Sequence, residues 1–599
     1  MPFGDLRAFL DQLRRAGELV TIDAPVDPRL EAAEIHRRVI AAGGPALLFT
    51  NVAGSRFRLV TNLFGTARRA EMAFGERPLR LIRRLVDLAE TIMPPTRATI
   101  WGARDVAREL LRIGTSKVSR GPVTEQVSAG LSLDALPVIT SWPEDGGPFI
   151  TLPLVYTTHP AKRGHNLGMY RMQVHDGRTA GMHWQIGKGG GYHYAVAESR
   201  SEPLPATVFL GGPPALILSA IAPLPENVPE LMLASLIAGE RLRQVHGIGE
   251  HPLIASAEFA LIGRVPPRIR RPEGPFGDHY GYYSLRHDYP VFELGAIAHR
   301  HDGGRVNGVV GKPRQEDFFI GDLLQELLSP LFPLVMPAVE GLWSYGETGY
   351  HSLSAAIVKQ RYKREAIASA FRILGEGQLS LTKFLFVTDR HVDLRNFTRT
   401  LEHILERTNV ETDLYVFSNL SMDTLDYTGP AVNEGSKGVW LGLGDPVRQL
   451  PREFSSATQP SGVGEVRVFC RGCLVVGAPA YAQEPGAPER LAADPAFVEW
   501  PLVVLTDDVA RATRSEMNFL WTTFTRFEPG ADIHSAGRRI VRNHVSYRGP
   551  VVIDARMKPT YPKELEPDDR TLTLVSQRWN EYFPARHVTM GDSSRGHLD

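Results

Sequence analysis

Apolar residues near the start of the chain recur with the period of an α-helix. Over residues 6–13 they fall on one helical face, while Asp, Gln and Arg occupy the other. The same criterion predicts a helix over 28–41 and helical structure over 79–113, interrupted at Pro94-Pro95. Short β-branched runs between these segments predict strands. We therefore predict a small α/β domain over residues 1–120.

From about residue 121 the helical period fades, and short apolar runs alternate with Gly- and Pro-rich turns. One helix is predicted, over 229–239. The predicted strands cover 154–158, 168–174, 207–209, 253–263 and 291–298. Several short strands closed by turns are typical of a barrel or a sandwich, which we place at 121–345.

The last part of the chain, 346–599, is predicted to be a second α/β region that begins with a long helix over 354–374. Phe386-Val-Thr-Asp389 and Val504-Leu-Thr-Asp507 each end a predicted strand and precede a predicted helix. Two explanations stay open: a partial duplication (about 381–450 and 500–565), or the general similarity of any two αβ units. The Pro-, Gly- and Ala-rich stretch 452–500 predicts long surface loops.

The composition is that of a folded protein without a general attraction to polyanions. The 599 residues are 43% hydrophobic and 22% charged, and 67 basic residues balance 67 acidic ones. Nucleic acid and anionic membranes are therefore not expected partners. The chain shows neither an apolar leader after its first residues nor an uninterrupted apolar run of membrane-spanning length, which predicts a cytoplasmic protein.

The two cysteines form a Cys470-Arg-Gly-Cys473 motif that has metal-binding or redox spacing. No second pair accompanies it, and β-branched runs flank it on both sides. The motif is therefore predicted to be a structural strand-turn-strand rather than a metal site.

Two segments carry candidate chemistry. His165-Asn-Leu-Gly-Met-Tyr-Arg171 combines an amide and a guanidinium around Gly168, which predicts a bulge or a close backbone approach. Glu273-Gly-Pro-Phe-Gly-Asp278 contains residues that exclude a helix, so it is predicted to be a tight loop with a carboxylate at each end. One Arg and two acids suit anion binding and proton transfer, although solvated acids on a turn are the simpler alternative.

A third segment, Gly187-Lys-Gly-Gly-Gly191, is rich in glycine but lacks the Lys-Ser/Thr pair of a nucleotide P-loop. It predicts either a backbone that approaches a ligand phosphate or a flexible turn.

Taken together, the ordered motifs resemble the UbiD family of decarboxylases, which use prenylated FMN. The resemblance covers most of the chain. It rests on Asn166-Leu-Gly-Met-Tyr-Arg171, Gly212-Pro-Pro, Glu273-Gly-Pro-Phe-Gly-Asp278, Gly311-Lys-Pro, Gly435-Ser-Lys-Gly438 and the C-terminal Ser576-Gln-Arg-Trp-Asn-Glu-Tyr segment.

The resemblance implies an N-terminal α/β domain, a central split β-barrel that binds the flavin, and a C-terminal α/β domain joined by a long helix. Arg171, Glu273 and Asp278 match the catalytic residues of the family. The residues that match cofactor-binding positions are Asn166, Met169, Tyr170, Arg171 and Lys437, of which Lys437 would bind the phosphate.

The metal site that the resemblance implies departs from the family pattern at one position. Asn166 and Glu230 match two ligands of a divalent metal, for which Mn²⁺ is expected, with K⁺ as a further cation. The third ligand, a histidine, would fall near position 187, which is Gly187 here. His193 is the predicted replacement, and His183 is predicted to line the substrate pocket.

The implied activity is reversible, non-oxidative decarboxylation of an aromatic, heteroaromatic or α,β-unsaturated acid through a covalent adduct with prenylated FMN. Arg171 would hold the carboxylate and Glu273 would protonate the product carbon, while Asp278 tunes Glu273. Because two acids face one Arg, one acid is expected to stay protonated near neutral pH.

The expected partners are a carboxylic acid substrate, a flavin prenyltransferase that supplies the cofactor, and further copies of the chain in a dimer or hexamer. The C-terminal helix, with Leu572, Val575 and Trp579, is a candidate for packing on a neighbouring subunit. Two alternative functions stay open: an oxidoreductase that uses ordinary FMN in a split barrel, and a metal-deficient, non-catalytic assembly partner.

Overall fold

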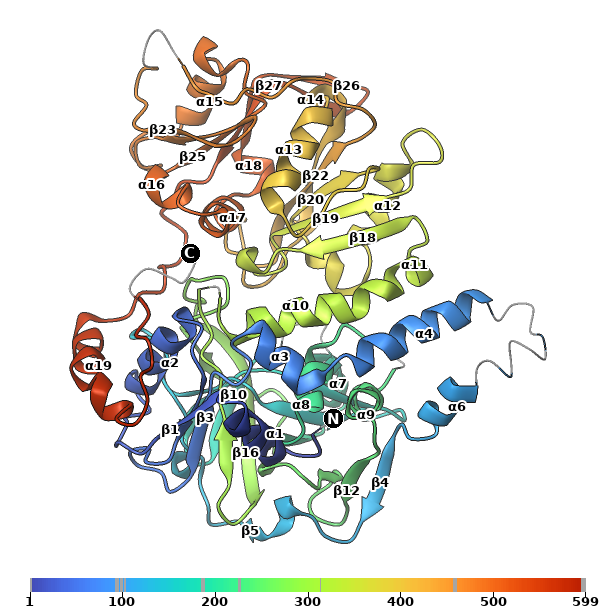
Figure 1. Cartoon of the computed structure of the whole chain (residues 1–599), viewed down its shortest axis with the longest axis vertical. Coiled ribbons are helices and arrows are strands. Elements are labelled where there is room, and N and C mark those ends of the chain that lie inside the picture. The colour runs from blue at the N-terminus through green and yellow to red at the C-terminus, as the bar shows by residue number, and fades with distance from the viewer. Residues whose placement is uncertain are drawn as a thin grey trace. The chain divides into compact units, whose positions relative to one another are not determined.

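The computed structural model describes residues 3–91, 96, 101, 104–184, 189–224, 228–312, 314–455 and 460–593. The chain divides into two compact units (Figure 1). The first unit contains the chain up to Leu327 together with the C-terminal segment from Glu564, and the second contains Leu328–Lys563.

The N-terminal part of the first unit is an α/β domain, as predicted, and it is built on a four-stranded sheet whose last strand comes from outside the predicted range 1–120. Its strands follow the order β1-β2-β3-β17, and the first two pair in parallel. The elements are α1 (Leu6–Arg15), β1 (Leu19–Ile22), α2 (Glu31–Ala41), β2 (Ala46–Phe49), β3 (Arg58–Thr61), α3 (Ala67–Phe74), α4 (Arg77–Thr91), α6 (Arg104–Leu110) and β17 (Gly304–Val306). The predicted helix break at Pro94-Pro95 lies outside the described residues.

The central domain is a ten-stranded antiparallel sheet. Its main path runs β6-β9-β10-β16-β14-β11-β7-β8, and two further strands pair with β16. Along the path the strands are β6 (Phe149–Ile150), β9 (Met172–Asp176), β10 (Thr179–Met182), β16 (His287–His299), β14 (Phe259–Val265), β11 (Leu204–Leu210), β7 (Leu154–Thr158) and β8 (His165–Met169). The two additional strands are β15 (Arg270–Glu273) and β5 (Gln126–Ser128).

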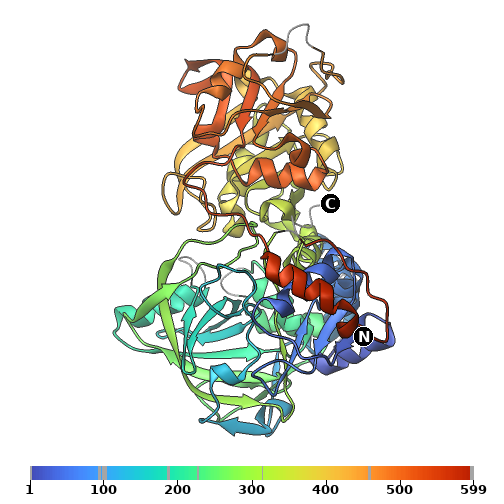
Figure 2. The ribbon, with the colours of Figure 1, turned by 90° about the vertical axis from the view of Figure 1, so that its left-hand side faces the viewer.

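This sheet must curl on itself because of one short connection. β8 lies at one end of the strand order and β9 lies next to the other end, yet only Tyr170 and Arg171 separate them along the chain. A two-residue link cannot span a flat sheet of this width, because neighbouring strands lie about 4.8 Å apart. The result is a barrel that stays open between β6 and β8, with Arg171 at the opening. The curled sheet lies in the lower part of Figure 2.

Helices and a small sheet complete the central domain. α7 (Gly189–Ser199) packs on β7, β8 and β11, and α9 (Glu230–Ala238) packs beside α8 (Pro214–Ile221). A three-stranded sheet contains β13 (Leu253–Ile254), β12 (Leu242–Val245) and β4 (Thr115–Val118). The prediction of a helix at 229–239 is therefore confirmed.

The C-terminal helix α19 (Asp569–Tyr582) packs against α2 of the same chain (Figures 1 and 2). Val575 is fully buried in the N-terminal core, and the hydroxyl of Tyr582 donates to Glu31 at 2.5 Å. The helix was predicted as part of the domain 346–599, but its buried face covers the N-terminal domain of its own chain. Packing of this helix on a neighbouring subunit stays a prediction.

The second unit contains two five-stranded sheets with the same strand order and the same directions. In β18-β19-β20-β22-β21 and in β23-β24-β25-β27-β26, an antiparallel pair flanks each side of a parallel centre. The first sheet is built from β18 (Val339–Ser344), β19 (Leu353–Val358), β20 (Phe384–Thr388), β21 (Leu414–Ser421) and β22 (Glu434–Gly442). The second is built from β23 (Val466–Cys470), β24 (Cys473–Gly477), β25 (Leu502–Thr506), β26 (Ile533–Val541) and β27 (His544–Asp554).

Corresponding helices connect the strands of the two sheets. Those of the first sheet are α12 (Glu365–Leu374), α13 (Phe397–Arg407) and α14 (Val410–Asp413). Those of the second are α15 (Ala487–Ala492), α16 (Val509–Ala512), α17 (Glu516–Phe524) and α18 (Pro529–Asp532).

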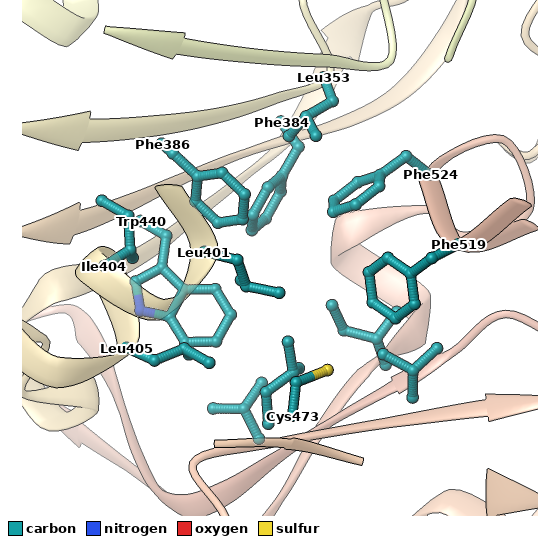
Figure 3. Packing of buried hydrophobic residues seen from close by; sticks show 14 of the residues in the cluster. Leu353, Phe384, Phe386, Leu401, Ile404, Leu405, Trp440, Cys473, Phe519 and Phe524 are labelled. Carbon is teal, nitrogen blue, oxygen red and sulfur yellow. The ribbon is translucent and has the colours of Figure 1, made fainter. Parts of the chain in front are cut away.

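The two sheets share one hydrophobic core. Phe384, Phe386 and Trp440 from the first sheet lie in the same cluster as Phe519 and Phe524 from the second (Figure 3). All five side chains are at most 1% exposed, so neither sheet has a separate core on this side.

Two predictions for this region are wrong. The long helix expected at 354–374 begins only at Glu365, because 353–358 form β19, which is buried between β18 and β20. The stretch 452–500 is not all surface loop, since β23, β24 and α15 lie within it and contribute buried residues to the core. In both cases burial between partner strands or helices outweighs local composition.

The cysteine motif is a β-hairpin, as predicted. Cys470 ends β23 and pairs with Cys473, which begins β24. Both thiols are free and buried, and burial raises the pKa of Cys473.

One helical stretch, Glu316–Val335, is long and apolar enough by length and composition to cross a membrane. It consists of α10 (Glu316–Leu328), a short 3₁₀ turn and α11 (Phe332–Val335). This is weak evidence for a membrane span, because the core helix of a folded protein passes the same test.

Candidate active site

The site forms where the barrel is open. Arg171 lies in the two-residue link between β8 and β9, and Glu273 is the last residue of β15. Asp278 follows in the loop after β15, where Gly277 pairs with Tyr283 in an isolated bridge. Asn166 and Arg171 do not share a strand, because β8 ends at Met169.

The guanidinium of Arg171 contacts both acids of the predicted network. Nε donates to Glu273 Oε1 at 3.0 Å, Nη1 donates to Asp278, and Nη2 donates to Ser284 Oγ at 3.3 Å. Its planar face lies over the Phe276 ring, with the guanidinium carbon 4.4 Å from the ring centre. Nη2 also lies 2.9 Å from Glu273 Oε1, so these contacts engage four of the five guanidinium N–H groups, and a bidentate grip on a substrate carboxylate requires one of the contacts to be exchanged.

The loop that carries the two acids is anchored by hydrogen bonds to its backbone. The Gly274 amide donates to Gln173 Oε1 at 2.8 Å, and the Gly277 amide donates to Asp145 Oδ1 at 2.8 Å. The prediction of a tight loop that places both acids in one site is thus confirmed. The alternative of solvated acids is wrong, because Glu273 is 1% and Asp278 5% exposed.

Charge governs the protonation of the two acids. Burial alone would raise the pKa of Glu273, but the charge of Arg171 and the bond from His183 outweigh it and lower that pKa to about 2. Burial likewise opposes ionisation of Asp278, yet Arg171 and His279 hold the pKa of its carboxyl well below its usual range. The expectation that one acid stays protonated near neutral pH is therefore wrong for this state of the protein.

His183 belongs to the same cluster. It follows β10, and its Nδ1 lies 3.0 Å from Glu273 Oε2. The Tyr289 ring lies against the imidazole, with the ring centres 4.4 Å apart. Burial and then the charge of Arg171 lower the pKa of His183, so the imidazole is neutral at pH 7. The structure places this predicted pocket residue directly on Glu273.

Asn166, Tyr170 and Glu230 form a second group beside the opening. Asn166 Nδ2 donates to the Tyr170 hydroxyl at 3.3 Å, and the same hydroxyl accepts from the Gly190 amide at 3.1 Å. Glu230, the first residue of α9, accepts from the Leu167 amide at 3.2 Å, and burial raises its pKa. Two of the predicted metal ligands are thus held next to β8.

His193 lies on α7 close to this group. Its Nδ1 lies 2.9 Å from Thr157 Oγ1, and Thr157 pairs directly with Asn166 across β7 and β8. Burial, then the neighbouring His159 and His165, lower the pKa of His193 to about 4. Within the described residues, no three His, Cys, Asp or Glu side chains gather as a metal site, and Gly187 lies outside those residues.

The remaining two predicted residues are Met169 and Lys437. Met169 ends β8 opposite Leu154 and is half-buried. Lys437 lies on β22 of the second unit, is 5% exposed, and donates from Nζ to the Thr382 carbonyl at 2.9 Å. Burial lowers its pKa to about 8.

Sequence reasoning missed several residues of the site. Asp145 holds the acidic loop, Ser284 binds Arg171, Tyr289 supports His183, and His279 Nδ1 lies 2.5 Å from Asp278 Oδ1. Only His279 had a local signal, because it directly follows Asp278. The others reach the site through pairing of distant strands and loops.

Three family models match the chain in the order of its domains. They describe the N-terminal, Rift-related and C-terminal domains of 3-octaprenyl-4-hydroxybenzoate carboxy-lyase, and they cover residues 10–89, 115–313 and 318–442. The chain belongs to the UbiD family and is a carboxy-lyase. The last model ends before β23, so the second five-stranded sheet lies beyond the matched residues.

Chlamydial relatives match nearly the whole chain. A protein of Chlamydia trachomatis described as uncharacterized is 51% identical over 97% of this chain and 100% of its own length. A protein of Chlamydia pneumoniae described as a component of 4-hydroxybenzoate decarboxylase is 50% identical over 97% of this chain and 99% of its own length.

Solved structures share the fold over about three quarters of the chain. Vanillic acid decarboxylase of Sedimentibacter hydroxybenzoicus aligns with a TM-score of 0.67 and 24% identity over 77% of this chain and 97% of its own. HmfF of Pelotomaculum thermopropionicum, in complex with FMN, aligns with a TM-score of 0.61 and 22% identity over 76% of this chain and 97% of its own.

Proposed function

We propose that this protein catalyses the reversible, non-oxidative decarboxylation of an aromatic, heteroaromatic or α,β-unsaturated carboxylic acid with prenylated FMN. The observation that carries the proposal is the buried convergence of Glu273 and Asp278 on Arg171 at the barrel opening. A solved HmfF structure described as a complex with prenylated FMN supports the cofactor.

The residues around the opening fit a polar heterocycle. The ring nitrogen Trp184 Nε1, which follows β10, is buried and has no hydrogen-bond partner among the residues that the structure describes. An unpaired buried donor is costly, so it is a suitable contact for an acceptor on a bound ring. Asn166, Met169, Tyr170 and Arg171 would hold the flavin, and Lys437 would hold its phosphate.

A divalent metal, for which we propose Mn²⁺, would bind beside the flavin phosphate. Asn166, Glu230 and His193 offer an amide oxygen, a carboxylate and a neutral imidazole, which together suit this ion.

The chemistry divides between cofactor and protein. Loss of CO₂ from an sp² carbon leaves an electron pair that no side chain accepts, and the bound prenylated flavin supplies the electron sink. Arg171 binds the substrate carboxylate in exchange for one of its present contacts. Glu273 delivers a proton to the carbon that loses CO₂, and Asp278 keeps Arg171 in place.

Because the pKa of Glu273 is about 2 in this state, Glu273 must gain its proton during the cycle. A substrate carboxylate that engages Arg171 adds negative charge beside Glu273 and raises its pKa, which favours protonation.

The test is to produce the protein together with a flavin prenyltransferase and to assay a panel of carboxylic acids for CO₂ release and for exchange with labelled bicarbonate. We expect at least one aromatic or unsaturated acid to react, and Glu273→Gln to abolish the reaction while the flavin stays bound. Absence of CO₂ release and exchange across the panel, with rapid flavin bleaching by NAD(P)H, would identify an oxidoreductase instead.

A further inference from the structure

Both carboxylate oxygens of Glu273 are already occupied. Oε1 accepts from Arg171 Nε at 3.0 Å, and Oε2 lies 3.0 Å from His183 Nδ1. Glu273 is 1% exposed, so bulk water does not reach these oxygens. Among the residues that the structure describes, Arg171 and His183 are the groups that bond these oxygens, so a proton that the protein passes to Glu273 comes through one of them.

Of the two partners, only His183 can transfer a proton. A guanidinium in a protein does not deprotonate, whereas a neutral imidazole carries one proton and one lone pair. Because Glu273 is ionised, its Oε2 must accept, and this places the imidazole proton on Nδ1 and the lone pair on Nε2.

The free end of the ring has no hydrogen-bond partner in the part of the chain that the structure describes. His183 Nε2 is buried and makes no hydrogen bond, and the whole residue is 8% exposed. The charged and titratable groups that face the ring are Arg171, Glu273, Asp278 and Tyr289. None of them bonds Nε2, so an acceptor lone pair remains for a donor from outside the chain.

We propose that His183 is the proton relay that recharges Glu273 in each turnover. The step passes the Nδ1 proton to Glu273 Oε2 while Nε2 takes a proton from hydronium in the solvent, so the ring stays neutral and changes tautomer. Glu273 then loses the proton to the product carbon. The ring is reset when Nε2 returns its proton to water and the imidazole rotates about its Cβ–Cγ bond, so that Nδ1 takes a proton from the solvent side before it turns back to Glu273. One solvent proton is consumed in each turnover. The relay rests on the proposed function, because it supplies the proton that decarboxylation consumes.

The resting tautomer is a direct test that needs no cofactor. We expect ¹⁵N spectra of histidine-labelled apoprotein at pH 7 to show His183 protonated at Nδ1 and bare at Nε2, with the signals assigned by their loss in His183→Asn. A ring protonated at Nε2 alone, or at both nitrogens, would overturn the relay. This result does not depend on whether any acid is a substrate.

Turnover provides the second test. His183→Asn keeps an amide donor close to the position of Nδ1 but cannot pass a proton on, so kcat should fall about 100-fold or more with unchanged flavin content. His175→Asn is the matched control, because His175 Nε2 is also buried and unpaired, but no bond joins this ring to Glu273. Parent-like turnover of His183→Asn would overturn the relay, whereas inactivity of the parent on every acid would count against the proposed function.

We call the first five-stranded sheet (β18–β22) with its helices the first copy. We call the second five-stranded sheet (β23–β27) with its helices the second copy. Asn409 and Glu528 occupy equivalent places before α14 and α18. The Asn409 amide donates to Asp413 at 2.9 Å, and the Glu528 amide donates to Asp532 at 2.7 Å.

The contacts between the two copies are reciprocal. α14 of the first copy packs on β27 of the second, and α18 of the second packs on β22 of the first. Together with the shared strand order, this exchange of equivalent helices indicates a duplicated unit whose halves are related by an approximate two-fold axis.

One of these contacts reaches the residue next to Lys437. The Ser436 hydroxyl donates to Glu528, and it accepts from the Gly530 amide at 2.6 Å. Ser436 is fully buried. The neighbouring Lys383 pairs with Asp426 at 2.7 Å, and its ammonium lies 5.4 Å from the centre of the Phe527 ring.

The equivalent strand of the second copy has no lysine. Gly438 pairs with Phe384, and Val551 pairs with Leu502. Because the Thr-Asp motifs align these strands, Pro550 takes the place of Lys437. Only the first copy therefore carries the ammonium group, and the second copy packs against it.

We infer that the second copy positions Lys437 for phosphate binding, with Glu528 as the positioning residue that holds Ser436. Glu528→Ala should weaken FMN binding to the apoprotein about tenfold, since it removes a hydrogen bond to a charged group, and Glu528→Gln should restore it. Asn409→Ala, the equivalent change in the first copy, should leave FMN affinity unchanged. Equal losses of FMN affinity in Glu528→Ala and Asn409→Ala would overturn the inference.

Chemical modification of Lys437 distinguishes the positioning role of Glu528 from the phosphate-binding role of Lys437. The rate at which a small aldehyde and a hydride donor methylate Lys437 should rise in Glu528→Ala and not in Asn409→Ala, because the strand is no longer held. Unchanged rates would reject the positioning role. A raised rate with unchanged FMN affinity would retain the positioning of Lys437 and reject its role in binding phosphate.

Discussion

Asp145 Oδ1 accepts a hydrogen bond of 2.8 Å from the amide of Gly277, which lies between the two acids that bind Arg171. The other oxygen of Asp145 accepts from the Ser141 and Trp142 amides at 3.0 and 2.9 Å. One side chain thus fixes the loop of Asp278 to a turn more than a hundred residues earlier.

Asp145→Ala should disorder the acidic loop without touching the flavin side of the site. Each backbone donor left unsatisfied costs about 1–3 kcal/mol, so we expect a lower Tm and a fall in kcat with flavin content preserved. Thermal unfolding and flavin absorbance measure the two effects. Parent-like kcat in Asp145→Ala would contradict the anchoring role.

Gly168→Ala should displace Tyr170. A Cβ at this position would lie 2.3 Å from the Tyr170 hydroxyl, so the ring must move and lose its bond from the Gly190 amide. We expect weaker FMN binding in a fluorescence titration. Gly304→Ala is the control, since a Cβ there meets no atom within 4 Å. Equal affinity in the two variants would show that Tyr170 does not contribute to flavin binding.

His193→Ala should lower metal content if Asn166, Glu230 and His193 form the proposed site. We expect protein grown with Mn²⁺ to lose most of its bound metal, because removing one protein ligand weakens a metal site strongly. Elemental analysis of the purified protein measures this. His159→Ala is the control, because the His159 ring lies beside His193, with the ring centres 5.2 Å apart, but is not a proposed ligand. Its metal content should match that of the parent. Identical metal content in all three proteins would remove His193 from the site.

Lowering the pH should reduce the Tm of the parent by more than it reduces the Tm of Glu273→Gln. Because the pKa of Glu273 is lowered to about 2 in the folded protein, its ionised form stabilises the fold above the ordinary carboxyl pKa. That contribution, on the order of 3 kcal/mol, is lost as the pH falls from about 4.5 towards 2. The Tm of the parent should fall more steeply over this range. Glu76→Gln, whose side chain is 86% exposed in the parent, should follow the parent curve.

Phe524→Ala should destabilise both sheets of the second unit together. The ring is 1% exposed and faces Phe384 and Phe386 across the shared core (Figure 3). Truncation of a buried Phe costs about 3–5 kcal/mol. Hydrogen exchange should accelerate in β20 and β25 alike, whereas Phe371→Ala, 54% exposed in the parent, should have little effect. Acceleration confined to β25 would mean that the sheets unfold separately.

Local pattern was sufficient for several elements. The helical spacing near the N-terminus, the helix at 229–239 and the Cys470–Cys473 hairpin each depend on neighbouring residues, so the sequence predicted them correctly. The loop from Glu273 to Asp278 was equally readable, because Pro and Gly exclude helix there.

Other elements depended on distant partners. β19 resembles a helix in composition, but it is buried between β18 and β20, and only that context makes it a strand. The packing of α19 on α2 joins segments more than 500 residues apart, which no local pattern reports.

The candidate residues of the site were found in two short motifs, one with an arginine and one with two acids, and the resemblance to the UbiD family suggested their roles. The protonation states of these residues could not be predicted from the sequence. Glu273 is ionised because Arg171 and His183 approach it inside a buried site, and electrostatic free energy depends on distance and burial rather than on position along the chain. Folding alone brings those three groups together, and their proximity gives Glu273 the charge that the spacing of the acids did not predict.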